Sequence, residues 1–128
     1  MAQKILAELA LPKGELSILL VDDARIQELN QQYLHRDKPT NVLAFPMKEG
    51  EFSSLHPDVL GDLVISVETA RRQSNRSGLD DMEMVTLLMI HGILHLLGYE
   101  HEGSRKGARE MSVKQRHLFH IAFTKGRS

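Results

Sequence analysis

The segment at residues 82–97 is apolar on nearly every side of a helix, and this pattern constrains the fold more than any other in the sequence. Asp80 or Asp81 is suited to begin the helix as an N-cap residue. Gly98 is suited to end it, because glycine readily adopts the left-handed conformation found beyond helix C-termini. A helix without a polar face has to be covered on several sides. We therefore predict a central helix with the remaining elements packed around it.

The rest of the chain alternates between strand and helix patterns, with no internal repeat or low-complexity tract. Short apolar runs predict strands at 16–21, 42–45 and 60–66, of which the last two could pair antiparallel. Helical spacing and capping residues predict further helices at 4–11, from Asp22 or Asp23 to the polar loop at 35–41, at 67–76 after the N-cap Ser66, and at 104–123. The sequence thus predicts one domain over residues 1–128 with an α+β fold, a small mixed β-sheet packed with about five helices.

Composition limits the chemistry that this domain can perform. The chain has 128 residues and no cysteine, so a metal site must use His, Asp or Glu. The lack of cysteine and of any apolar run of about eighteen residues leads us to expect a cytoplasmic protein with no membrane partner. From residue 104 onward there are seven Lys or Arg and one acid, against an overall net charge of -1. Such a basic segment is either a solvated helix face or a surface that binds anions such as nucleic acid.

Three histidines occur within eleven residues, in the stretch HGILHLLGYEH at 91–101. His91 and His95 are four residues apart, so both lie on one face of the central helix. The turn at Gly98 would bring His101 back toward them. Three neutral imidazoles can bind one Zn²⁺ ion and leave a fourth tetrahedral position for water or substrate, which is the arrangement of a catalytic zinc site. For the other four histidines we expect ordinary structural roles.

The histidine spacing equals that of the metzincin peptidases, H-E-x-x-H-x-x-G-x-x-H. Those enzymes use the glutamate after the first histidine as the general base, whereas this chain has Gly92 at that position. Glycine cannot accept a proton, so the pattern disfavours peptide hydrolysis. The metal alone could still activate water near neutral pH, or Glu100 could serve as the base.

Three sequence blocks resemble the YbeY family of bacterial single-strand-specific endoribonucleases, which act in ribosomal RNA maturation and ribosome quality control. The blocks are HGILHLLGYEH at 91–101, the pair Leu29-Asn30 together with DKPTNVLAFP at 37–46, and LGDLVIS at 60–66. They follow one another in the family's order across about the central two-thirds of the chain. A match of three such blocks is far more specific than a single HxxxH pair.

The resemblance implies an α+β fold, one zinc ion bound by His91, His95 and His101, and single-stranded RNA as substrate, with ribosomal RNA and the small ribosomal subunit as partners. It also implies a role in maturation of the 16S rRNA 3′ end.

Two positions depart from the family pattern, because Glu100 replaces the usual aspartate and Leu34 stands where many members have an arginine. Arg36, two positions further on, is our candidate to supply that cation, and Arg36 and Glu100 are our candidate catalytic residues. The alternatives are a metzincin-like metallopeptidase and a non-catalytic ribosome assembly factor with a structural zinc.

Overall fold

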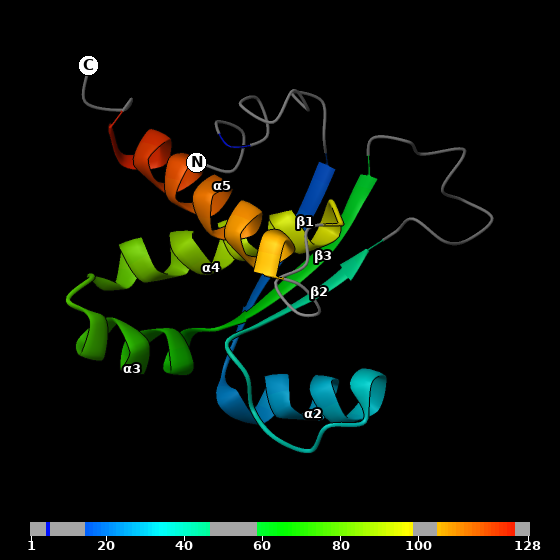
Figure 1. The fold of residues 1–128 in the computed structure, drawn as a ribbon. Helices are drawn as coiled ribbons and strands as arrows, with labels where there is room; N and C mark the ends of the chain where they lie inside the picture. Colours follow the sequence, from blue (N-terminus) through cyan, green and yellow to red (C-terminus); the bar gives the residue numbers. More distant parts are fainter. Residues whose placement is uncertain (1–4, 6–14, 47–58, 99–104, 125–128) are drawn as a thin grey trace.

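The computed structural model describes residue 5 and residues 15–46, 59–98 and 105–124 (Figure 1). Over these residues the chain forms β1 (Glu15–Val21), α2 (Asp23–Leu34), β2 (Val42–Pro46), β3 (Val59–Ser66), α3 (Val67–Ser77), α4 (Asp81–Leu96) and α5 (Arg105–Thr124). The predicted α+β fold is confirmed, with four helices in the described part of the chain. The helix predicted at 4–11 lies outside that part except for Ile5, which is helical and buried.

The three strands form a mixed sheet with the order β1-β3-β2. β1 runs parallel to β3, with Val21 opposite Ser66. β2 runs antiparallel to β3, with Leu43 opposite Val64. The antiparallel pairing predicted for the last two strands is therefore confirmed.

Alternate residues of β3 point to opposite faces of the sheet, and residues 63–66 are buried on both faces. Leu63 and Ile65 belong to the main core, which lies between the sheet and α3, α4 and α5. Val64 packs with Leu43 and with Ile26 of α2 in a smaller cluster on the other face. Burial on both sides explains why β3 has a nearly continuous apolar sequence.

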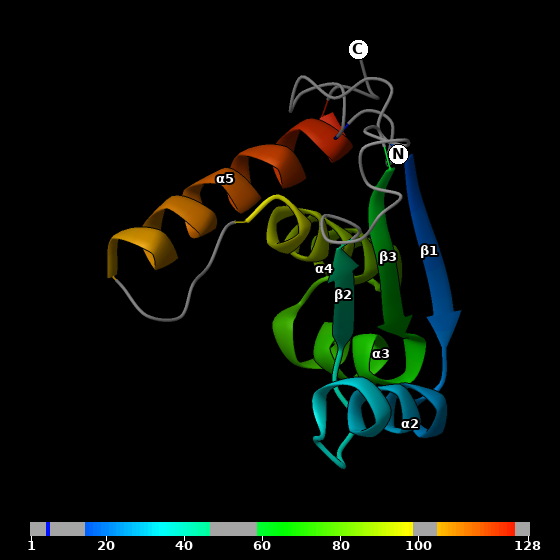
Figure 2. The same cartoon turned by 90° about the vertical axis from the view of Figure 1, so that its right-hand side faces the viewer.

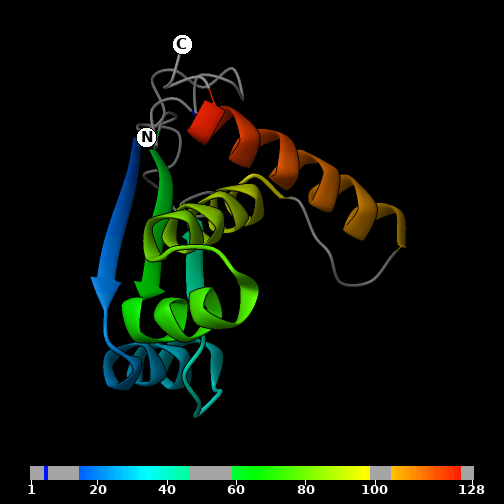
Figure 3. The same cartoon turned by 90° about the vertical axis from the view of Figure 1, so that its left-hand side faces the viewer.

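Helix α4 occupies the centre of the molecule, as its apolar sequence predicted. It contacts α3, α5, β2 and β3, and Figures 2 and 3 show it lying between the sheet and α5. Nine of its residues are buried, and they lie all around the helix axis. Among the described helices, none combines the length and the apolarity needed to cross a bilayer.

Gly92 allows α4 to approach β3 very closely. A Cβ atom built on this glycine would lie 2.6 Å from Cδ2 of Leu63, well inside van der Waals contact. Leu63 is fully buried and has little room to move. A Cβ at position 92 would therefore meet packed core.

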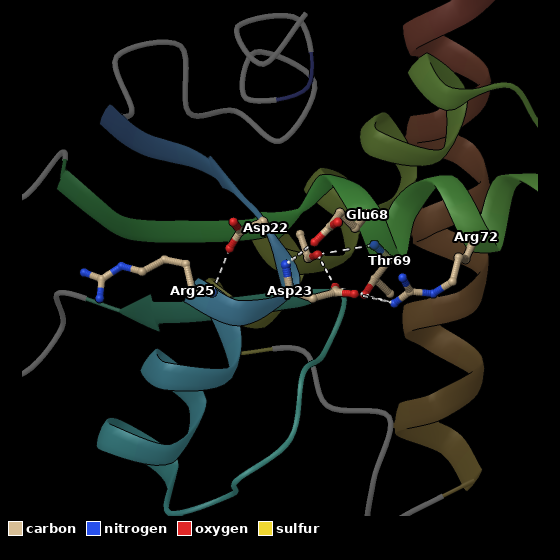
Figure 4. Close-up of polar contacts among 7 residues, drawn as sticks. Asp22, Asp23, Arg25, Glu68, Thr69 and Arg72 are labelled. Carbon is tan, nitrogen blue, oxygen red and sulfur yellow. Dashed lines mark hydrogen bonds and ion pairs between the residues drawn. The ribbon is translucent and has the colours of Figure 1, made fainter.

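The N-termini of α2 and α3 are joined by a polar network around Asp23 (Figure 4). Its carboxylate accepts hydrogen bonds from the hydroxyls of Ser66 and Thr69, both at 2.6 Å, and pairs with Arg72 at 2.8 Å. In return, the backbone N–H of Asp23 donates to Glu68 at 2.8 Å. The two hydroxyl hydrogen bonds, followed by Arg72, lower the pKa of Asp23 to about 2. The network fixes α2, and with it the loop that follows α2, to the carboxyl ends of the two parallel strands.

Candidate metal centre

Local signals at both ends of α4 set the position of its histidines. Asp80 accepts a hydrogen bond from the backbone N–H of Glu83 at 2.7 Å, and Glu83 accepts one from the N–H of Asp80 at 3.0 Å. This capping box begins the helix where the sequence predicted. At the other end Gly98 has a φ of +94° and donates its N–H to the carbonyl oxygen of His95 at 3.0 Å. The chain thus turns directly after the second histidine.

The rings of His91 and His95 lie together on one face of α4. Their centroids are 4.6 Å apart in an edge-to-face arrangement, and their Nε2 atoms are separated by 3.1 Å. Two nitrogens bound tetrahedrally to one zinc at ~2.0–2.1 Å would be about 3.3 Å apart. The observed separation fits a pair of nitrogen ligands for one such ion with little rearrangement.

The remaining predicted ligand, His101, lies outside the described residues, as does the candidate base Glu100. Within the described ranges no group of three His, Cys, Asp or Glu side chains is placed to hold a metal. The structure therefore brings together His91 and His95 from the predicted triad.

A cleft of about 560 Å³ opens beside the two histidines. Its wall includes Arg36 and Lys38, which the sequence placed in the loop after α2, together with Thr40. Leu34, at the position of the usual family arginine, also lines the cleft. The two histidines and the two cations, which are more than fifty residues apart in sequence, thus share one cavity. None of the basic side chains of α5 is among the described lining residues of this cleft.

Asn30 holds the loop at 35–41, which contains Arg36 and Lys38, against α2. This side chain is only 2% exposed, and its amide donates to the carbonyl oxygen of Lys38 at 2.9 Å. The backbone carbonyl oxygen of Asn30 accepts a hydrogen bond from the backbone N–H of Arg36 at 3.3 Å. Gln27 adds a further hydrogen bond to Asp37 at 3.0 Å. The Leu29-Asn30 block therefore contains the residue that fixes the backbone on both sides of position 37.

Gln115 of α5 is a site residue that the sequence did not reveal. Its Oε1 lies 2.9 Å from Nδ1 of His91, on the side of the ring opposite Nε2. On α5, Gln115 lies about one turn from Met111 and Leu118, which form a buried stripe in the main core. The sequence held no signal that this stripe meets α4 at His91, because that contact depends on how the two helices pack.

Comparison with known proteins identifies the family. The family model described as "Endoribonuclease YbeY" matches residues 1–122. A protein named Endoribonuclease YbeY from Syntrophotalea carbinolica is 49% identical over 119 residues, which cover 92% of this chain and 79% of the relative. Its namesake from Geobacter metallireducens is 44% identical over 126 residues, which cover 98% of this chain and 84% of the relative.

A solved structure supports the same relationship. The solution structure of a Thermotoga maritima protein has a TM-score of 0.65 and 30% sequence identity to this chain. The match covers 97% of this chain and 85% of the other. With its fold, its histidine pair and its family match in agreement, the chain belongs to the YbeY endoribonuclease family.

Proposed function

We propose that this protein is a zinc-dependent, single-strand-specific endoribonuclease that acts in the cytoplasm on ribosomal RNA. Its task would be maturation of the 16S rRNA 3′ end and quality control of the small ribosomal subunit. The observation that carries the proposal is the shared cleft, which contains the paired Nε2 atoms of His91 and His95 and the cations Arg36 and Lys38. Metal ligands beside cations that can bind phosphate oxygens suit metal-assisted cleavage of a phosphodiester.

In this proposal His91, His95 and His101 hold one zinc ion. When bound, zinc supplies Lewis-acid chemistry, because it polarises a phosphoryl oxygen and lowers the pKa of water. Arg36 and Lys38 bind the non-bridging phosphate oxygens and stabilise the charge that develops in the transition state. The hydroxyl of Thr40 adds an uncharged donor in the same wall.

The nucleophile is either water or the 2′-hydroxyl of the RNA. No Asp or Glu is among the described residues that line the cleft, so Glu100 remains our candidate for the general base. Apart from the two histidine rings, the described lining contains no aromatic side chain. Bases therefore have few rings to stack on there, which favours recognition of the RNA backbone over its sequence.

The proposal is tested by measuring metal content and RNA cleavage for the wild type, His95→Ala and His117→Ala. His117 is an exposed histidine of α5 outside the cleft and serves as the matched control. We expect His95→Ala to lose both zinc and cleavage, and His117→Ala to keep both. A His95→Ala variant that has lost zinc but cleaves RNA like the wild type would refute the proposal.

Assays of casein cleavage and of RNA or ribosome binding with the same variants separate the two alternatives. A metallopeptidase would show zinc-dependent cleavage of casein and leave RNA intact. Such an enzyme would need a base after the first histidine, but this chain has Gly92 there, at the edge of the cleft, and a Cβ at that position would lie 2.6 Å from Cδ2 of Leu63. A non-catalytic assembly factor would bind RNA or ribosomes without cleaving RNA faster than His95→Ala does.

A further inference from the structure

The contact between Gln115 and His91 joins two helices that are far apart in sequence. The two residues are 24 positions apart, and both side chains are half-buried. Gln115 and His91 also share the wall of a second cavity, of about 430 Å³, on the α3 side of α4. The contact therefore lies on the side of His91 that faces this second cavity, and Arg36 and Lys38 are not among the described residues that line it.

The chemistry of the two side chains determines what this contact does. A neutral imidazole carries one N–H, and its other nitrogen has the lone pair that can bind a metal. An amide oxygen can only accept, so the Oε1 of Gln115 requires the proton of His91 to be on Nδ1. The lone pair of His91 is then on Nε2, the atom that lies 3.1 Å from Nε2 of His95.

The surroundings of Gln115 hold its amide in this position. Met111, one turn before it, is 2% exposed, and Leu118, one turn after it, is fully buried. Both belong to the main core together with residues of α4. The backbone of α5 at Gln115 is thus anchored on both sides, and the amide reaches His91 from a fixed helix.

We propose that Gln115 is a positioning residue, which sets the tautomer and the ring orientation of His91 for metal binding. This inference rests on the proposed zinc site and adds a requirement from α5, an element that supplies none of the predicted ligands. Partners that orient a metal-binding histidine in this way typically contribute about 10–100-fold to metal affinity. We expect loss of the acceptor at position 115 to weaken zinc binding by a factor in this range.

The test compares zinc affinity, measured by chelator competition, and the visible spectrum of the Co²⁺-substituted protein. Gln115→Leu removes the acceptor with little change in size, and Gln115→Glu keeps an acceptor oxygen. Gln32→Leu makes the same change at an exposed position of α2 outside both cavities. We expect Gln115→Leu to bind zinc about 10–100-fold more weakly with an altered Co²⁺ spectrum. Gln115→Glu should match or exceed wild-type affinity, and Gln32→Leu should match it.

Melting of the zinc-free proteins separates a positioning role from a loss of structure. If Gln115→Leu does not fold, Gln115→Met provides the same comparison with a more flexible apolar side chain. Wild-type affinity and spectrum in a folded apolar variant would overturn the inference, as would a Gln115→Glu variant as weak as the apolar one. Failure of the wild type to bind zinc would instead overturn the proposed metal site, and this inference with it.

Discussion

Gly92 of α4 faces Leu63 of β3 so closely that an added Cβ would lie 2.6 Å from the leucine Cδ2. The sequence suggested that glycine here marks the absence of a peptidase base. The structure adds a packing reason, since the Cβ of any side chain at position 92 would meet Leu63 in the filled core between α4 and the sheet, although Gly92 also lines the cleft beside the histidines. The residue that separates this sequence from the metzincin pattern also allows the histidine-bearing helix to lie close against the sheet.

Gly92→Ala should destabilise the protein even though alanine favours helix formation. Overpacking of a core costs about 1–3 kcal/mol, and the gain in helix propensity returns at most about 1 kcal/mol. We expect a lower midpoint in urea unfolding. The double variant Gly92→Ala, Leu63→Ala should lose less stability than the sum of the two single variants. The shorter side chain at position 63 makes room for the new methyl group, and that methyl group fills part of the space left by the leucine. Strict additivity would show that the two positions do not compete for the same space.

The network around Asp23 makes stability depend on pH. The pKa of Asp23 is lowered from 3.8 to about 2, so the folded state binds a proton less readily than the unfolded state. This contribution is complete above the unfolded pKa and is lost as the pH falls from about 4 to about 2. Asp23→Asn should therefore be less stable than the wild type at pH 7, and the difference should shrink across that range.

Unfolding midpoints measured between pH 7 and pH 2 check this prediction. Glu28→Gln serves as the control, because Glu28 forms an exposed pair with Arg25 at 3.2 Å, which we expect to contribute at most about 1 kcal/mol. If Asp23→Asn were less stable than the wild type by the same amount at all pH values, the pH dependence would not come from Asp23.

Asn30→Ala should loosen the loop that contains Arg36 and Lys38. The change leaves the carbonyl oxygen of Lys38 without its amide donor, which we expect to cost about 1–3 kcal/mol of stability. Zinc affinity should stay at the wild-type value, since Asn30 contacts neither histidine through a described hydrogen bond. RNA affinity should fall. Parallel measurements of zinc and RNA dissociation constants would separate these effects, and weakened zinc binding would count against a role confined to the loop.

Neutralising the cleft cations should reduce the salt dependence of RNA binding. Each phosphate contact to single-stranded nucleic acid contributes a slope of about 0.7 in log affinity against log salt. Arg36→Gln and Lys38→Gln should each reduce the slope by roughly this amount. Arg25→Gln, at a cation outside the cleft, should leave it unchanged. Equal slopes for the wild type and both cleft variants would mean that neither cation contacts phosphate.

The elements of the fold were largely predictable because their signals are local. The N-caps Asp22, Ser66 and Asp80, the left-handed Gly98 and the apolar runs of the strands each depend on a few neighbouring residues. The parallel pairing of β1 with β3 and the close contact at Gly92 were not predicted, because both depend on elements far apart in sequence.

The site, like the fold, was predictable only where the signals are local. His91 and His95 could be paired from the helical period alone, and Arg36 could be named as a candidate cation. Their meeting in one cleft, and the contact of Gln115 with His91, arise from tertiary packing. No periodicity within one helix carries that information.

In the proposed function, one zinc ion bound at the histidine pair is required for RNA cleavage. The most direct measurement is cleavage of a single-stranded RNA by zinc-depleted protein during titration with Zn²⁺. We predict negligible cleavage without zinc, and a rise that reaches its plateau at one ion per chain. Cleavage at the full rate in protein verified to be zinc-free would contradict the claim.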